Sequence, residues 1–146
     1  MSDVAAAAPV LCPSAQPDMA GARVLGMLSG SAEEPRVAYL PKGVELDVAA
    51  ARSLLPQTPT KAFRFAAHCE SERCLHFAAG RCSLAERVVR QLPEVVDALP
   101  PCQIRSGCRW YAEQGAAACR RCPQVITMIP RHDDAMNRVA LPEGPP

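Results

Sequence analysis

The chain has 146 residues, and its 16 Lys and Arg side chains nearly balance 15 Asp and Glu side chains, which gives a formal net charge of +1 at pH 7. The length predicts one domain with loose ends, and the charge by itself indicates no class of partner. Aromatic residues make up only 4% of the chain. A core of side chains alone would therefore be thin, and a metal centre that joins several segments would stabilise it.

The beginning of the chain does not have the pattern of a secretory signal. It contains Asp3 and Pro9 and no Lys or Arg before Arg23, whereas such a signal starts with positive charge and continues with an apolar run. The longest apolar runs are also far shorter than the roughly 20 residues that span a bilayer. We therefore expect a cytoplasmic protein, in which cysteine clusters bind metal more often than they form stable disulfides.

The first 40 residues predict an arm followed by a hairpin. Residues 1–21 are rich in Ala and Pro and have no helical or strand period, so we predict a disordered arm that carries Cys12. Apolar runs at about 22–28 and 36–40 flank a segment of turn-forming residues, and this pattern predicts a β-hairpin.

A helix and a strand are predicted next. Apolar residues recur at helical intervals over about 46–55, behind Asp47, which is a favourable helix cap. Polar and apolar residues then alternate over 61–66, which predicts a strand that leads into Cys69. Charged residues and a Gly between Cys69 and Cys82 indicate an ordered loop.

The clearest local signal follows Cys82. Ser83 and Glu86 have the spacing of a capping box, so a helix should begin there. Apolar residues keep helical spacing as far as Leu99. Pro93 should kink this helix or divide it into two helices.

Shorter elements are predicted towards the end of the chain. A helix is expected over 106–114, with Gly115 able to take the left-handed conformation past its end. A last strand is predicted over 124–129. The polar and Pro-rich segment 130–146 predicts a flexible tail, so the cysteine-rich metal-binding domain would span 22–129.

Seven of the eight cysteines lie between residues 69 and 122, and a cluster this dense indicates disulfides, zinc or iron–sulfur centres. All eight are candidate ligands: Cys12, Cys69, Cys74, Cys82, Cys102, Cys108, Cys119 and Cys122. The last four provide the thiolates that one [4Fe–4S] cluster or one tetrahedral zinc ion requires. Among the rest, Cys69, Cys74 and Cys82 lack a fourth partner, which would be Cys12, His68 or His76. Cys12 divides the eight cysteines into two groups of four.

The spacing favours iron–sulfur clusters over zinc. Most structural zinc sites use two close pairs of ligands, whereas this sequence has a single close pair, Cys119-x2-Cys122. The Pro after Cys122 is similar to the final ligand of bacterial ferredoxins, although the C-x2-C-x2-C run of ferredoxins does not occur. Ten basic against six acidic residues over 61–122 would balance the negative charge of two such sites. We therefore predict two [4Fe–4S] clusters, with zinc as the alternative.

Other chemistries have weaker signals. Basic residues and aromatics in one window are also found in nucleic-acid-binding enzymes that carry structural clusters, but no reading motif accompanies them here. Cys119 and Cys122 around two arginines have the spacing of a redox dithiol, without the strand and long helix that such motifs use. No Ser/His/Asp set, paired carboxylates or phosphate loop has a spacing that supports an enzyme. Five aromatics in this window would either shield a cluster from water or form the core.

Six segments carry a resemblance to a known family: Leu11-Cys12-Pro13-Ser14, residues 34–40, 63–66, 99–105 and 108–110, and Cys119-x2-Cys122-Pro123-Gln124-Val125. Together they resemble small cysteine-rich bacterial proteins that are common in cyanobacteria and often labelled "nitrogen fixation protein". The resemblance covers roughly residues 10–127 and implies no established reaction. Because it includes the surroundings of Cys12, it favours Cys12 as a member of the ligand set.

The sequence therefore predicts an α+β protein in which a small antiparallel sheet and short helices are organised around two Cys-ligated metal sites. The expected function is electron transfer to or from a partner protein, or service to metallocluster enzymes, without a substrate pocket of its own. The competing class is a zinc-stapled interaction module. We expect neither a membrane nor a nucleic-acid partner.

Overall fold

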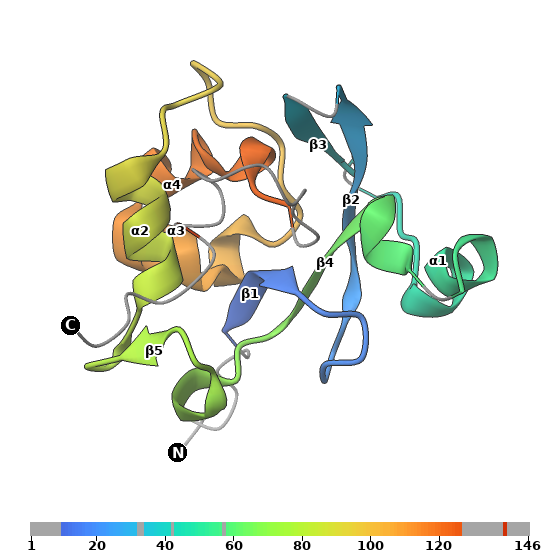
Figure 1. Ribbon diagram of the computed structural model, residues 1–146, viewed down its shortest axis with the longest axis horizontal. Helices are drawn as coiled ribbons and strands as arrows, with labels where there is room; N and C mark the ends of the chain where they lie inside the picture. The colour runs from blue at the N-terminus through green and yellow to red at the C-terminus, as the bar shows by residue number, and fades with distance from the viewer. Residues whose placement is uncertain (1–9, 32–33, 42, 57, 127–138, 140–146) are drawn as a thin grey trace.

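A four-stranded antiparallel sheet lies between two groups of short helices in the computed structural model (Figure 1). The structure describes residues 10–31, 34–41, 43–56, 58–126 and 139. The strands, in sheet order, are β1 (Leu11–Ala15), β4 (Phe63–His68), β2 (Arg23–Gly30) and β3 (Pro35–Tyr39). Every neighbouring pair is antiparallel, so the fold is α+β with a small antiparallel sheet, as predicted.

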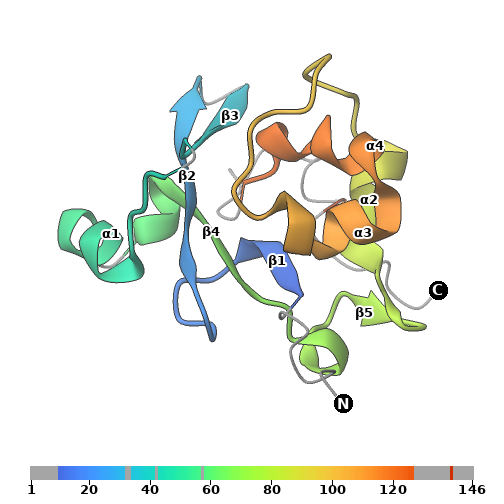
Figure 2. The ribbon, with the colours of Figure 1, turned by 180° about the vertical axis from the view of Figure 1, so that it is seen from behind.

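Short helices surround this sheet. Figures 1 and 2 show α1 (Val48–Leu54) on one side and a group of three helices on the other: α2 (Ser83–Gln91), α3 (Arg109–Gln114) and α4 (Ala116–Cys119). Single 3-10 turns span Pro59–Lys61, Ser71–Arg73, Arg105–Gly107 and Cys122–Gln124. A second, two-stranded sheet pairs β5 (Phe77–Ala78) with β6 (Arg81–Cys82).

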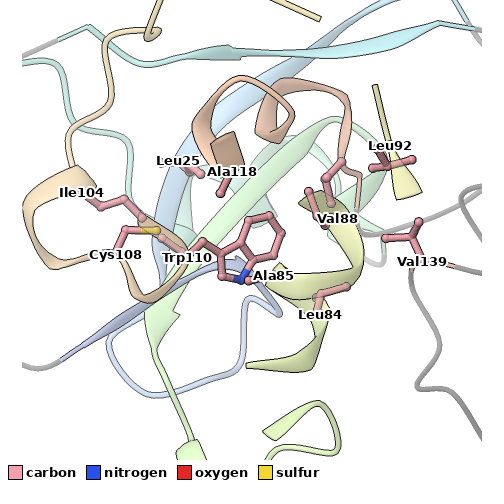
Figure 3. Close-up of a cluster of buried hydrophobic side chains, with 12 residues drawn as sticks. Leu25, Leu84, Ala85, Val88, Leu92, Ile104, Cys108, Trp110, Ala118 and Val139 are labelled. Carbon is pink, nitrogen blue, oxygen red and sulfur yellow. The ribbon is translucent and has the colours of Figure 1, made fainter. Parts of the chain in front are cut away.

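Alternation along β4 separates two cores, because successive side chains of a strand point to opposite faces. Phe63 and Phe65 pack in one core with residues of α1 and β2. Ala66 belongs to the other core, which contains α2, α3 and α4, and the guanidinium of Arg64 lies over the Trp110 ring of that core. Figure 3 shows the indole of Trp110 in the middle of this second core, among residues of α2 and α4.

The N-terminal arm is partly a strand. Residues 11–15 form β1 at the edge of the sheet, so the prediction of a disordered arm is wrong for them. Between Cys12 and Ala15, β1 has one residue more than β4, which is a β-bulge over Pro13 and Ser14. An edge strand tolerates a proline because one row of its amides has no partner strand. Residues 1–9 lie outside the described residues.

Helix α2 begins where the sequence predicts, but with a different cap. The sulfur of Cys82, rather than the hydroxyl of Ser83, accepts the hydrogen bond from the amide of Ala85 at 3.4 Å. The Ser83 hydroxyl donates instead to the carbonyl of His76 at 2.6 Å. The capping box therefore predicts the helix start correctly and the capping side chain wrongly.

The predicted continuation of α2 is wrong. The helix ends at Gln91, and residues 94–99 are not helical, so Pro93 neither kinks nor divides a helix. Leu92 has the extended backbone that a following proline favours. The amide of Val95 then donates to the carbonyl of Arg120 at 2.9 Å, which ties this segment to the end of α4.

Several other predicted elements are confirmed. The hairpin is β2–β3, and the predicted strand at 61–66 is β4, shifted by two residues. Helix α1 lies within the predicted 46–55, and Asp47 caps it by accepting from the amide of Ala50 at 2.8 Å. Helix α3 begins three residues later than predicted, after a 3-10 turn. Gly115 ends it with a φ of 69°, a conformation that glycine adopts readily.

The C-terminal predictions are only partly covered. Gln124 ends a 3-10 turn and residues 125 and 126 are not in a strand, while 127–129 of the predicted last strand lie outside the described residues. In the segment predicted as a flexible tail, Val139 is buried against the core and its carbonyl accepts from Nε of Arg87 at 2.8 Å. The tail prediction is therefore wrong at this residue. Within the described ranges, none of the helices is long and apolar enough to cross a membrane.

Candidate functional site

The eight cysteines lie around two separate cavities, four around each. All eight belong to the described residues and all are free thiols. Cys12, Cys69, Cys74 and Cys82 line a cavity of about 270 Å³. Cys102, Cys108, Cys119 and Cys122 line a second cavity of about 20 Å³. We call these groups the first and the second cysteine group.

Strand pairing brings the first two sulfurs of the first group together. Cys12 pairs with Ala67 across β1 and β4, and Cys69 lies two residues beyond Ala67. Such a diagonal pair shares one face of the sheet, with Cα atoms roughly 7–8 Å apart. The amide of Cys69 donates to the carbonyl of Val10 at 2.8 Å, which continues the pairing past the end of β4.

A small hairpin positions the other two sulfurs of the first group. Cys74 follows a 3-10 turn, and its carbonyl accepts from the amide of Phe77 at 3.0 Å. Phe77 pairs with Cys82 across β5 and β6. The two loop residues of this hairpin, Ala79 and Gly80, have φ values of 53° and 78°, as a type I′ turn requires. The turn therefore returns the chain so that Cys82 lies near Cys74.

Hydrogen-bond donors surround the sulfurs of the first group. The amides of Ser71, His76 and Ala85 donate to the sulfurs of Cys69, Cys74 and Cys82, each at 3.4 Å. The amide of Ser14 is hydrogen-bonded to Cys12. Donors of this kind stabilise a thiolate over a thiol. Every sulfur of the first group thus accepts a bond from a backbone amide two or three residues further along the chain.

Helix α3 contacts the first group through two charged side chains. Nε of Arg109 donates to the sulfur of Cys69 at 3.1 Å, and Nη2 donates to the hydroxyl of Ser71 at 3.3 Å. Glu113 pairs with Arg109 at 3.0 Å and also accepts from the amide of Cys82 at 2.9 Å. Arg109 and Glu113 are one helical turn apart on α3. Together they link the segment of Cys69 to the segment of Cys82.

The second group comes from helix ends. Cys108 is the N-cap of α3, Cys119 ends α4, and Cys122 begins the 3-10 turn that follows. The backbone amide of Ile104 is hydrogen-bonded to Cys102. The cavity between these sulfurs is walled mainly by apolar groups, among them Trp110, which is 2% exposed. Cys108 is buried, and the other three cysteines of this group are partly exposed.

A buried arginine contacts the second group. Arg64 is 1% exposed, and its Nη2 donates to the sulfur of Cys122 at 2.8 Å. Nη1 donates to the carbonyl of Val125 at 3.0 Å, and Nε donates to the carbonyl of Pro13 at 2.7 Å. Burial lowers the pKa of Arg64, whereas the sulfur of Cys122 raises it. The net effect is a raised pKa. The guanidinium therefore stays charged beside this sulfur.

Burial opposes ionisation of Cys12, Cys82, Cys102 and Cys108 by raising their pKa values. It raises the pKa of Cys12 and that of Cys108 to about 12, in each case against the lowering effect of a nearby amide. Burial and the sulfur of Cys122 also raise the pKa of Tyr39, whose side chain is hydrogen-bonded to that sulfur. A thiol of this kind becomes a thiolate at neutral pH only with a cation beside it.

The two histidines considered as ligands have different surroundings. His76 has Nδ1 at 2.8 Å from Nη2 of Arg87, and because a guanidinium can only donate, Nδ1 accepts this bond. Burial and the charge of Arg87 lower the pKa of His76. His68 is exposed at the rim of the first cavity and packs against Gly21, where an added Cβ would lie 2.4 Å from Nε2. Cys12, His68 and His76 all line the first cavity, so the choice of Cys12 as the fourth ligand stays a prediction.

The side-chain arrangement does not by itself define a metal site. Within the described part of the chain, no three or more His, Cys, Asp or Glu side chains converge in the way that holds a metal ion. The sulfurs share cavities and influence one another's ionisation. Metal ligation by any of the eight cysteines therefore stays a prediction, whereas their division into two groups is a property of the fold.

The residues fit an anionic cofactor in their chemistry. Each cysteine group has an arginine in contact with one of its sulfurs, Arg109 with Cys69 in the first and Arg64 with Cys122 in the second. Two buried donors of residues that line the second cavity, Nε of Arg105 and Nε1 of Trp110, have no hydrogen-bond partner among the described residues. Two of the ten basic residues counted over 61–122, Arg64 and Arg109, thus donate hydrogen bonds to cysteine sulfurs.

Sequence reasoning missed the roles of Arg64 and Arg109, which it counted only as charge. Arg64 lies between Phe63 and Phe65 in a strand that is apolar on both faces, and a charge in such a strand must have a buried partner. The position of this arginine between two phenylalanines is visible in the sequence and could have indicated a buried partner. Phe77 and Trp110 line the cavities, Trp110 also lies in the core, and Phe63 and Phe65 pack in the other core, so the core role is confirmed and the shielding of a cluster stays a prediction.

The chain was compared with models of known protein families, with curated proteins and with solved structures, and none of them matches it. The resemblance to cysteine-rich bacterial proteins therefore stays a prediction.

Proposed function

We propose that this protein binds two [4Fe–4S] clusters and carries electrons to or from a partner protein, or serves metallocluster enzymes in this way. The ligands would be the first cysteine group for one cluster and the second cysteine group for the other. The observation that supports this proposal most strongly is the gathering of eight free cysteines into two groups of four, with donors directed at their sulfurs.

A [4Fe–4S] cluster held by four thiolates supplies a one-electron redox centre. The residues of the chain would hold the thiolates in their charged form and limit access of water. The guanidinium groups of Arg64 and Arg109 lie beside the sulfurs of Cys122 and Cys69. Their positive charge would favour binding of a cluster by these sulfurs as thiolates, and it would favour the reduced cluster, which is the more negative state. Trp110 and Tyr39 shield the second group, so the second site should be the drier of the two.

Zinc is the second candidate, and one observation favours it. The cavity between Cys102, Cys108, Cys119 and Cys122 is only about 20 Å³, which suits a single ion better than the larger first cavity does. Four thiolates are also a common ligand set for structural zinc. A protein with zinc at both sites would be an interaction module that carries no electrons.

Absorption of anaerobically purified full-length protein separates the two candidates. Iron–sulfur charge transfer gives a brown protein with broad absorption near 400 nm that weakens on reduction with dithionite. We expect this spectrum, together with iron and acid-labile sulfide in equal amounts. A colourless protein with stoichiometric zinc would overturn the electron-transfer proposal, and a protein without metal would overturn both candidates. Since metal-thiolate proteins of this type belong to reducing compartments, the proposal includes a cytoplasmic location.

A further inference from the structure

Arg64 contacts a cysteine of the second group and the residue that follows Cys12 of the first group. One side of its guanidinium donates to the sulfur of Cys122 at 2.8 Å, in the second group. Its Nε donates to the carbonyl of Pro13 at 2.7 Å, and Pro13 follows Cys12 of the first group. The side chain is 1% exposed and lies over the ring of Trp110, 5.7 Å from the ring centroid. It therefore joins two segments that are distant in sequence.

The side-chain acceptor of Arg64 is the sulfur of Cys122. The ion pairs with carboxylates include those of Arg81, Arg109, Arg120 and Arg121, and among the described residues no carboxylate pairs with Arg64. Its other bonds go to the backbone carbonyl oxygens of Pro13, Cys122 and Val125. A buried cation that loses its only anionic partner strongly destabilises the structure around it. The segments that surround Arg64 therefore depend on the sulfur of Cys122 as an acceptor for this side chain.

A second connection joins the two groups through β1. Leu11, next to Cys12, forms a parallel β-bridge with Cys108 of the second group. With about 4.8 Å between bridged strands and 3.8 Å between successive Cα atoms, the Cα atoms of Cys12 and Cys108 lie within about 9 Å of each other. The bulge at Pro13, which turns its carbonyl to Arg64, lies in the same strand.

From these contacts we infer that Arg64 couples the two metal sites, so that filling of the second site supports filling of the first. This inference rests on the proposed function in that it requires metal at both sites, whether iron or zinc. Arg64 is a positioning residue and not a ligand. When Cys122 is bound as a thiolate, Arg64 keeps its counter-ion and holds the bulged strand that carries Cys12. When that sulfur is lost, the unpaired guanidinium disturbs β1 and with it the first site.

Two matched variants of the second group test the coupling. Cys122→Ala and Cys119→Ala each remove one candidate ligand of the second site, but Cys122 is the one whose sulfur contacts Arg64. Both should empty the second site. Cys119→Ala should keep about half of the wild-type metal, whereas Cys122→Ala should keep no more than about a quarter, because the first site is weakened as well. Metal per chain, iron and zinc together, is measured after anaerobic purification.

Removal of the cation should reverse the effect. In Cys122→Ala combined with Arg64→Met, no unpaired charge remains in the core, so metal should return to about half of the wild-type value. Equal metal in Cys122→Ala and Cys119→Ala would overturn the coupling. So would a double variant that has the wild-type circular dichroism spectrum but no more metal than Cys122→Ala. A wild-type chain without metal would instead overturn the proposed function, and the coupling with it.

Discussion

At the scale of single residues, the identity of the fourth ligand of the first site depends on Cys12. Cys12 pairs with β4 and lines the first cavity with Cys69, Cys74 and Cys82, and His68 lies at the rim of the same cavity. We expect Cys12→Ala to lose about half of the iron, because a cluster with three ligands is labile. His68→Ala is the matched control and should keep all of it. Full iron content in Cys12→Ala would remove Cys12 from the ligand set.

Arg109 should set the reduction potential of the first site. Its Nε donates to the sulfur of Cys69 at 3.1 Å, so its positive charge favours the reduced, more negative state. In Arg109→Gln we expect one midpoint potential to fall by about 30–60 mV, which for a one-electron couple is a tenfold change in the equilibrium constant or less.

A redox titration followed by electron paramagnetic resonance measures this shift, and the other centre of the same protein is the internal reference. Arg73→Gln is the control variant, because Arg73 is an exposed residue that lines the same cavity. If both midpoints move equally, or neither moves, Arg109 does not have this role.

At the scale of elements, the two faces of the sheet should respond differently to mutation. Val88 of α2 is fully buried in the core that holds Cys108 and Trp110. Val88→Ala leaves a cavity there and should lower the free energy of unfolding by about 2 kcal/mol and speed the loss of iron. Gln91→Ala, at an exposed position of the same helix, should change stability by less than about 0.5 kcal/mol. Urea unfolding under anaerobic conditions provides the comparison.

Helix α1 lies on the other face of the sheet and contributes to a different core. Asp47 accepts the hydrogen bond that caps this helix, so Asp47→Ala should lower the free energy of unfolding by about 1 kcal/mol. The iron content should stay at the wild-type level, since none of the eight cysteines belongs to this core. Loss of iron in this variant would show that the two faces are not independent.

Element prediction succeeded where a pattern is local. The cap at Asp47 and the alternation before Cys69 depend on neighbours in the sequence, and both helix and strand were found. It failed where a distant segment decides. Residues 11–15 are a strand because β4 offers them an edge, and the segment after α2 is not helical but is tied to the end of α4, where the amide of Val95 donates to the carbonyl of Arg120. Composition alone contains neither fact.

At the scale of the whole molecule, the division of the cysteines followed from counting thiols and from the resemblance around Cys12. The hydrogen bonds that surround their sulfurs did not follow. Arg64 is 58 residues from Cys122 in sequence, and only the register of β4 against the helices brings them together. Long-range contacts of this kind are a property of the sheet topology and cannot be derived from the spacing of cysteines.

The mass of the intact, anaerobically purified protein tests the central claim most directly. Native mass spectrometry should give the mass of the 146-residue chain plus two units of four iron and four sulfide. Dissociation in acid should return the chain mass with all eight thiols reduced. A native mass equal to the chain alone, to the chain with zinc, or to a chain that has lost hydrogens through disulfide formation would contradict the account.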